Sequence, residues 1–270
     1  MTTYRSLTID TADHIATVTL LGPGRGNAMG PDFWREMAPA FASLDADPEV
    51  RAIVLRGSGS HFSYGLDLMG MMGELGQHIM GPKLADDRVK LLALIDRMQE
   101  AVSAVSACRK PVIAAIDGWC IGGGLDLAAA CDIRICSAQA QFSLREIRLA
   151  IVADLGSLQR LPPIIGQGHT RQLAYTGENI DAARALHIGL VNDVYPDADA
   201  LHAAASALAA RIAASSPVTV RGVKQVLDYC ADKSIQDGLR YTAVWNAAFL
   251  QSDDLAEAIS AFMERREAKF

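Results

Sequence analysis

Two glycine-rich turns hold the backbone groups best placed to bind a negatively charged oxygen. The first turn spans residues 61–68 (HFSYGLDL) and the second spans residues 120–126 (CIGGGLD), and each comes after a predicted buried strand. In the second turn, consecutive glycines open a predicted helix, so the unpaired N–H groups of its first turn point into the space beyond the strand. This arrangement favours an oxyanion site. A tight strand-to-helix turn that needs positive φ angles would explain the same glycines without a ligand.

Three acidic side chains are predicted to lie around the same crevice. Asp126 sits in an apolar helical segment, and Glu146 and Asp154 lie in the loop segment after the next predicted strand. Carboxyl groups buried near one another have raised pKa values and serve as general acids and bases. Structural roles are the alternative: Asp126 would be favoured by the positive end of a helix, and Asp154 fits the N-cap of one. Glu146 could form surface ion pairs with Arg145 and Arg148.

Several classes of site are excluded because their motifs are missing. The chain has no P-loop, serine-hydrolase elbow or zinc-protease motif, and the loop at residues 22–27 lacks the last glycine of the dinucleotide fingerprint. The six histidines are scattered singly and the five cysteines show no CxxC spacing, which argues against a metal site. With 25 basic against 31 acidic residues, the chain is not expected to bind nucleic acid.

Length and composition predict a globular protein with one large core. The chain has 270 residues, 50% of them apolar, and a formal net charge of −6. Its first residues lack the features of a signal peptide, and no stretch is long and apolar enough to suggest a membrane span. We therefore expect a cytoplasmic protein with no membrane partner.

The elements that must position these groups are predicted to form a βαβ core followed by helices. A hairpin is expected in the first twenty residues, with its turn at Asp13-His14, and a helix begins at Pro31. Continuous apolar strands between helices are typical of a parallel sheet covered on both faces, and they are predicted at residues 52–55, 112–116, 133–136 and 191–195. The chain is therefore divided into a core, residues 1–197, and a helical region, residues 198–270. The apolar helix faces of that region must pack on the core or on another subunit.

Several sequence segments together carry a family resemblance over essentially the whole chain. They are residues 26–29 (GNAM), 62–68 (FSYGLDL), 110–134 (KPVIAAIDGWCIGGGLDLAAACDIR), 189–196 (GLVNDVYP), 216–220 (SPVTV) and 262–270 (FMERREAKF). In these segments the chain resembles the crotonase (enoyl-CoA hydratase/isomerase) superfamily. The resemblance implies an α/β crotonase fold, a spiral of ββα units that forms an acyl-CoA-binding catalytic core. It also implies a C-terminal helical trimerisation region and a homotrimer or a dimer of trimers.

Two further segments point to one branch of that superfamily. Residues 154–166 (DLGSLQRLPPIIG) and 244–255 (VWNAAFLQSDDL) are similar to those of the Δ3,5-Δ2,4-dienoyl-CoA isomerases. The resemblance implies an enzyme of fatty-acid β-oxidation that converts a 3,5-dienoyl-CoA to the 2,4-dienoyl-CoA. The reaction removes a proton from C2 and adds one at C6, so two acid/base groups at different depths are needed.

The resemblance also assigns roles to individual residues. The backbone N–H groups of Leu66 and Gly123 would form the oxyanion hole for the thioester carbonyl. Glu146 would take the proton from C2, Asp154 would donate one to C6, and Asp126 would orient the pair. Acyl-CoA is then the substrate, and neither a metal nor a cofactor is expected. The substrate-binding residues would be Ser63, Tyr64, Gly65, Leu66, Asp67, Gly122 and Gly123.

Two other functions stay open at this point. In a 2-enoyl-CoA hydratase, Asp126 and Glu146 would hold a water molecule between them. A chain of another class would be a non-catalytic CoA-binding scaffold.

Departures from the family pattern, which leave the acyl specificity open, are Tyr64, Trp119, Arg148 and Ala150. Arg25 is placed by the resemblance near the pantetheine and nucleotide.

Overall fold

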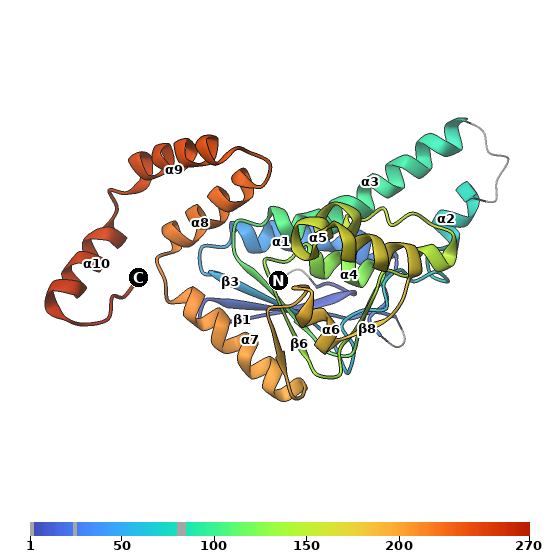
Figure 1. Ribbon diagram of the computed structural model, residues 1–270, viewed down its shortest axis with the longest axis horizontal. Coiled ribbons are helices and arrows are strands. Elements are labelled where there is room, and N and C mark those ends of the chain that lie inside the picture. Colours follow the sequence, from blue (N-terminus) through green and yellow to red (C-terminus); the bar gives the residue numbers. More distant parts are fainter. Residues whose placement is uncertain (1–2, 24–25, 80–84) are drawn as a thin grey trace.

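A six-stranded sheet forms the centre of the computed structural model, which describes residues 3–23, 26–79 and 85–270 (Figure 1). The strand order is β1-β2-β3-β4-β6-β9, with β1 and β2 antiparallel and the other neighbouring pairs parallel. The strands are β1 (Leu7–Ala12), β2 (Ile15–Leu20), β3 (Ala52–Gly57), β4 (Val112–Ile116), β6 (Ile133–Ser137) and β9 (Asp193–Tyr195). The expected hairpin is confirmed: Asp13 and His14, both with positive φ angles, connect its strands.

Both faces of this sheet are covered by helices, as the continuous apolar strands predict. On one face the core includes α1 (Pro31–Ala46) and α3 (Ala85–Ala107), and on the other α7 (Ala198–Ala213) contacts β3, β4 and β6. The alternation along β3 shows the division, since Ile53 and Leu55 belong to the first core and Ala52 and Val54 to the second.

A second, three-stranded sheet was not expected from the sequence. It pairs β5 (Trp119–Ile121) with β7 (Gln141–Ser143), and β7 with β8 (Ile180–Asp181). Strands of two or three residues leave no detectable alternation, which is why the pattern missed them. This small sheet brings the second glycine-rich turn beside the segment that carries Glu146.

Helices α4 (Gly123–Ala129) and α6 (Ala182–His187) contact this second sheet, and α2 (Met72–Ile79) contacts α3. The other core elements are the 3-10 helix η1 (Glu146–Leu149) and α5 (Ser157–Thr176). Helix α5 runs through Pro162 and Pro163 and bends at Gly166, whose φ of 79° is not helical. Glu146, which was expected in a loop segment, is the first residue of the 3-10 helix η1.

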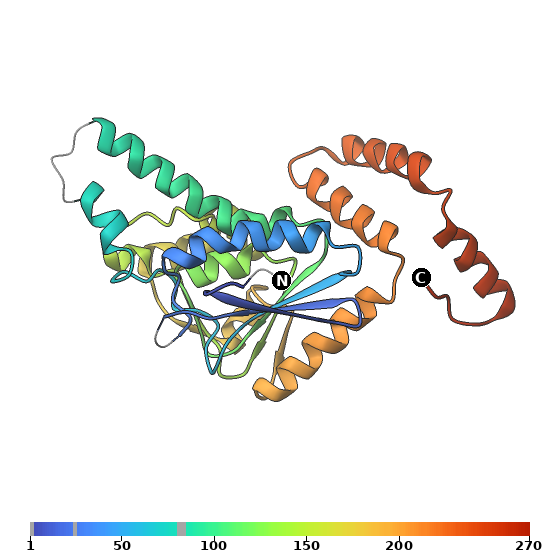
Figure 2. The same cartoon turned by 180° about the vertical axis from the view of Figure 1, so that it is seen from behind.

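The last three helices extend away from the sheet (Figures 1 and 2). They are α8 (Pro217–Cys230), α9 (Ile235–Phe249) and α10 (Asp253–Glu264), and the side chain of Ser216 caps α8. Their exposed apolar side chains include Val223, Leu227, Ile235, Leu239, Phe249, Ile259, Phe262 and Met263. An ion pair joins α8 to the core, with Nζ of the buried Lys224 2.7 Å from Oδ2 of Asp132, a residue exposed to solvent.

Within the described residues, none of the individual helices has the length and apolar character needed to cross a membrane. Helices α7 and α8, taken together, pass that test but are bent by 105° relative to each other.

Candidate active site

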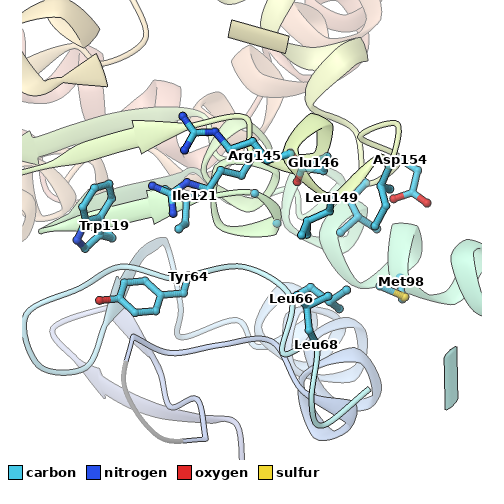
Figure 3. A pocket seen from close by; sticks show the side chains of 15 residues that line it. Tyr64, Leu66, Leu68, Met98, Trp119, Ile121, Arg145, Glu146, Leu149 and Asp154 are labelled. Atoms are coloured by element: carbon cyan, nitrogen blue, oxygen red, sulfur yellow. The ribbon is translucent and has the colours of Figure 1, made fainter. Parts of the chain in front are cut away.

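A cavity of about 560 Å³ lies between the first glycine-rich turn, the three-stranded sheet and the segment that leads into α5. Figure 3 shows Tyr64 and Trp119 toward one end of it, Met98 and Asp154 toward the other, and Glu146 between them. The lining residues are Tyr64, Leu66, Leu68, Met98, Trp119, Ile121, Gly122, Gly123, Arg145, Glu146, Arg148, Leu149, Ile151, Asp154 and Leu155.

The two glycine-rich turns touch each other in the wall of this cavity. A Cβ atom on Gly65, whose φ is +78°, would stand 2.8 Å from the backbone nitrogen of Gly123 and 2.7 Å from the carbonyl oxygen of Ile121. Only a residue without a side chain fits there. Leu66 comes directly after Gly65, and Gly123 is part of the contact itself. The close approach of the two turns therefore places Leu66 and Gly123 side by side.

The backbone N–H groups of Leu66 and Gly123 donate to no protein acceptor within the described part of the chain. Gly123 is the first residue of α4, so its N–H has no carbonyl one turn earlier. Around Leu66, Met29 donates to the carbonyl of Gly65 over 2.7 Å and Asp67 donates to the carbonyl of Met29 over 3.1 Å. The loop is therefore fixed on both sides of the free N–H of Leu66. Together, the N–H groups of Leu66 and Gly123 can hold an oxyanion.

Glu146 reaches the second glycine-rich turn from η1. Its Oε1 atom lies 3.0 Å from the point where a Cβ of Gly122 would be, and its Oε2 atom is buried without a hydrogen-bond partner among the described residues. Burial, and then the charge of Asp126, raise the pKa of Glu146 to about 7. No ion pair links Glu146 to Arg145 or Arg148 in the described structure, so the surface-pair explanation fails. A carboxyl group in this state suits a general base.

Asp126 lies behind the cavity wall and does not line the cavity. Its side chain is fully buried, and Oδ1 accepts a 2.6 Å hydrogen bond from the backbone N–H of Ser157, at the start of α5. Oδ2 has no partner within the described residues, and burial raises the pKa of Asp126 to about 6. The structure thus places Asp126 where it can act on Glu146 through its charge and hold α5, without touching a ligand.

Asp154 lines the cavity at the end away from Trp119 (Figure 3). The N-cap of α5 is Gly156 and not Asp154, so the N-cap explanation for Asp154 is wrong. The side chain is half-buried, and burial raises the pKa of its carboxyl. Gln99 on α3 donates a 2.6 Å hydrogen bond to the backbone carbonyl of Asp154.

The predicted substrate-binding residues divide into two groups. Tyr64, Leu66, Gly122 and Gly123 line the cavity, whereas Ser63, Gly65 and Asp67 do not. The buried Ser63 hydroxyl donates to the carbonyl of Asn27 and accepts from the N–H of Gly65, and Asp67 Oδ1 accepts from the N–H of Gly70. These three residues therefore shape the loop from behind. Arg25 lies outside the described residues.

Other lining residues were not predicted as part of the site. Arg145 places its guanidinium 5.2 Å from the ring centroid of Trp119 and donates to Asn179, while Met98 and Leu149 form apolar walls. The helical spacing of Met98 indicated only a core position. Proximity across α3, η1 and the glycine-rich turns arises from tertiary packing, which a sequence pattern does not report.

The chain is similar to known proteins over essentially its whole length. The family model described as "Enoyl-CoA hydratase/isomerase" matches residues 10–270. Curated relatives include the peroxisomal Delta(3,5)-Delta(2,4)-dienoyl-CoA isomerase of Arabidopsis thaliana, 42% identical over 100% of this chain and 98% of the relative. The mitochondrial enzyme of that name from Homo sapiens is 42% identical over 98% of this chain and 81% of the relative.

A solved structure shows the same fold. The enoyl-CoA hydratase of Bacillus anthracis superposes with a TM-score of 0.89 at 28% identity, covering 98% of this chain and 99% of that one. The expected crotonase fold is thus confirmed. The expectation of a cytoplasmic location is contradicted, because the dienoyl-CoA isomerases above are named peroxisomal or mitochondrial, names that do not themselves locate this chain. The match to the family model, the sequence identity with the curated relatives and the shared fold together show that the chain belongs to the enoyl-CoA hydratase/isomerase family.

Proposed function

We propose that the protein is a Δ3,5-Δ2,4-dienoyl-CoA isomerase of fatty-acid β-oxidation. One observation carries the proposal: two carboxyl groups with raised pKa values line the same cavity at different places, Glu146 against the second glycine-rich turn and Asp154 at the end away from Trp119. A proton shift along a conjugated chain needs this separation. The names and whole-length similarity of the relatives support the same substrate class.

In the proposed reaction the thioester carbonyl accepts hydrogen bonds from the N–H groups of Leu66 and Gly123. Glu146 removes a proton from C2, and the electron pair is delocalised into the carbonyl and along the two double bonds. Asp154 then gives its proton to C6, which completes the 2,4-diene. An aimed donor of this kind stabilises the transition state by about 3–4 kcal/mol, so the pair supplies a large part of the acceleration.

Asp126 is assigned a positioning role through charge and structure. Its charge helps to keep the pKa of Glu146 high, and its bond to Ser157 holds the start of α5 beside the segment that ends in Asp154. The proposed steps move only protons, so neither a metal nor a redox cofactor takes part in them.

A 2-enoyl-CoA hydratase is the second candidate, because the solved structure above carries that name. Hydration would need Asp126 and Glu146 to hold a water molecule between them in the cavity. The position of Asp126 behind the wall, with one oxygen bound to Ser157, argues for isomerisation instead. A CoA-binding scaffold would have no use for two unpaired buried carboxyl oxygens.

We also propose that the chain forms a homotrimer or a dimer of trimers through α8, α9 and α10. The exposed apolar side chains on these helices support an interface between copies, since a face of this kind is costly in water.

The test is a spectrophotometric assay with 3,5-octadienoyl-CoA and crotonyl-CoA in parallel. Formation of the conjugated dienoyl thioester as the faster reaction supports the proposal. Faster hydration of crotonyl-CoA would refute it in favour of the hydratase, and binding without turnover of either compound would favour a scaffold.

A further inference from the structure

Asp154 borders two cavities, not one. The second, of about 610 Å³, lies on the other side of the segment at residues 152–156, and Asp154 and Leu155 line both. Gln99, Val152 and Gln159 line the second cavity and are exposed to solvent. In Figure 3 the Asp154 carboxylate points away from Glu146. The carboxyl group at the far end of the substrate cavity therefore has a second opening to water.

Glu146 also borders a second cavity, but one of a different character. Its Oε2 atom is fully enclosed, and the other cavity it borders is lined mostly by apolar side chains, among them Leu144, Ile151 and Leu158. When an acyl chain fills the substrate cavity, water reaches Glu146 poorly. The two acids thus differ in their contact with solvent while the ligand is bound.

This difference matters because each turnover leaves the two acids in the wrong state. Glu146 ends neutral, having taken the C2 proton, and Asp154 ends as a carboxylate, having given its proton to C6. Before the next cycle Glu146 must lose a proton and Asp154 must gain one. Both exchanges balance with water and need no other reactant.

We propose that the second cavity is the route by which water returns a proton to Asp154 while the thioester still occupies the first. Gln99 keeps this opening in place, because its side-chain amide holds the Asp154 backbone from the exposed face of α3. The inference rests on the proposed isomerase function and adds a solvent route to it.

The experiment follows hydrogen exchange in the product. The 2,4-dienoyl-CoA is incubated with the enzyme in D2O, and deuterium is followed by NMR at C6 of this compound and at C2 of the 3,5-dienoyl-CoA with which it equilibrates. Asp154 removes a proton from C6, exchanges it for deuterium through the second cavity and returns the deuterium to C6. This sequence labels C6 without involving Glu146. We expect labelling at C6 to be faster than labelling at C2 by about tenfold in the wild-type protein.

Gln159→Trp fills the second cavity from its exposed edge, and Gln167→Trp places the same side chain at an exposed position of α5 that lines neither cavity. We expect the first variant to slow C6 labelling until it matches C2, and the second to behave as wild type. Val152→Phe fills the same cavity from another side and is used if the first variant fails to fold.

Equal labelling of C6 and C2 in the wild-type protein, or fast C6 labelling in both cavity-filling variants, would overturn the inference. In either case the isomerase assay decides the proposed function separately, because conversion of the 3,5-dienoyl-CoA demonstrates the activity whichever route returns the proton to Asp154.

Discussion

Gly65→Ala tests the oxyanion hole through the contact between the two glycine-rich turns. The new Cβ would stand 2.8 Å from the Gly123 nitrogen and 2.7 Å from the Ile121 oxygen, and both obstacles are backbone atoms. The turns must therefore separate, which moves the N–H of Gly123 away from that of Leu66. Loss of one donor costs about 3–4 kcal/mol in the transition state, so kcat should fall by about 10²–10³-fold.

The positive φ of Gly65 adds a cost that has nothing to do with catalysis, since an alanine there is strained by about 1–2 kcal/mol. Gly59→Ala is the matched control: its φ is +65°, and an added Cβ meets nothing within 4 Å. Both variants should lose similar stability from the backbone, and only Gly65→Ala should also lose activity.

The assay measures kcat and KM with 3,5-octadienoyl-CoA, together with thermal unfolding of both variants. Because the oxyanion interaction strengthens in the transition state, the loss should appear mainly in kcat. If kcat in Gly65→Ala falls no further than in Gly59→Ala, the N–H pair does not stabilise the enolate and the assignment is refuted.

The remaining predictions concern the acids and one ion pair. Asp154→Asn should lower isomerisation by about 10²–10⁴-fold while binding of a saturated acyl-CoA, measured by calorimetry, is retained; full activity would contradict its role. Because Glu146 must be ionised to accept a proton, kcat/KM should rise with pH through about 7, and Asp126→Asn, which removes a nearby charge, should move this limb to lower pH. An unmoved limb would exclude the charge effect. Lys224→Ala removes the buried partner of Asp132, which stays in contact with solvent, and should lower the free energy of unfolding by about 1–3 kcal/mol. Lys233→Ala, in a fully exposed pair, should leave it almost unchanged in the same denaturant titration.

The stability of the fold should also depend on the pH through Asp126. Its pKa is about 6 in the folded protein against 3.8 as the reference value, so the folded state binds more protons between these two values. The free energy of unfolding should therefore fall as pH rises from about 4 to 6. The slope should become shallower in Asp126→Asn but should not vanish, because Glu146, whose pKa is raised to about 7, adds a slope of the same sign. An unchanged slope in denaturant titrations would show that Asp126 does not contribute.

The large sheet could be predicted from the sequence because β3 and β4 are continuous apolar runs, which is the pattern of a strand buried on both faces. It is insufficient for the small sheet, where strands such as Ile180–Asp181 are too short to show a period. Chain breakers also conceal α5, since Pro162 and Gly166 interrupt the spacing expected of one helix.

The same limit applies to the candidate site. Glycines at the start of a helix indicate free N–H groups directly, so Gly123 follows from local chemistry. The position of Asp126 does not, because its burial and its partner Ser157 depend on how α4 and α5 pack. Asp154 could be separated from a helix cap only by seeing that Gly156 occupies that position.

The segment between Glu146 and Asp154 has a consequence for how such enzymes diversify. It contains a left-handed residue, Ala150, and exposed apolar side chains that include Leu149 and Ile151. In the proposed reaction its length determines how far apart the chain holds the carboxyl group that takes the proton and the one that gives it. A deletion that drew the two acids together would favour a shift over fewer carbons, so regiochemistry could change during evolution through the length of one short segment, with the enolate-stabilising turns left unaltered.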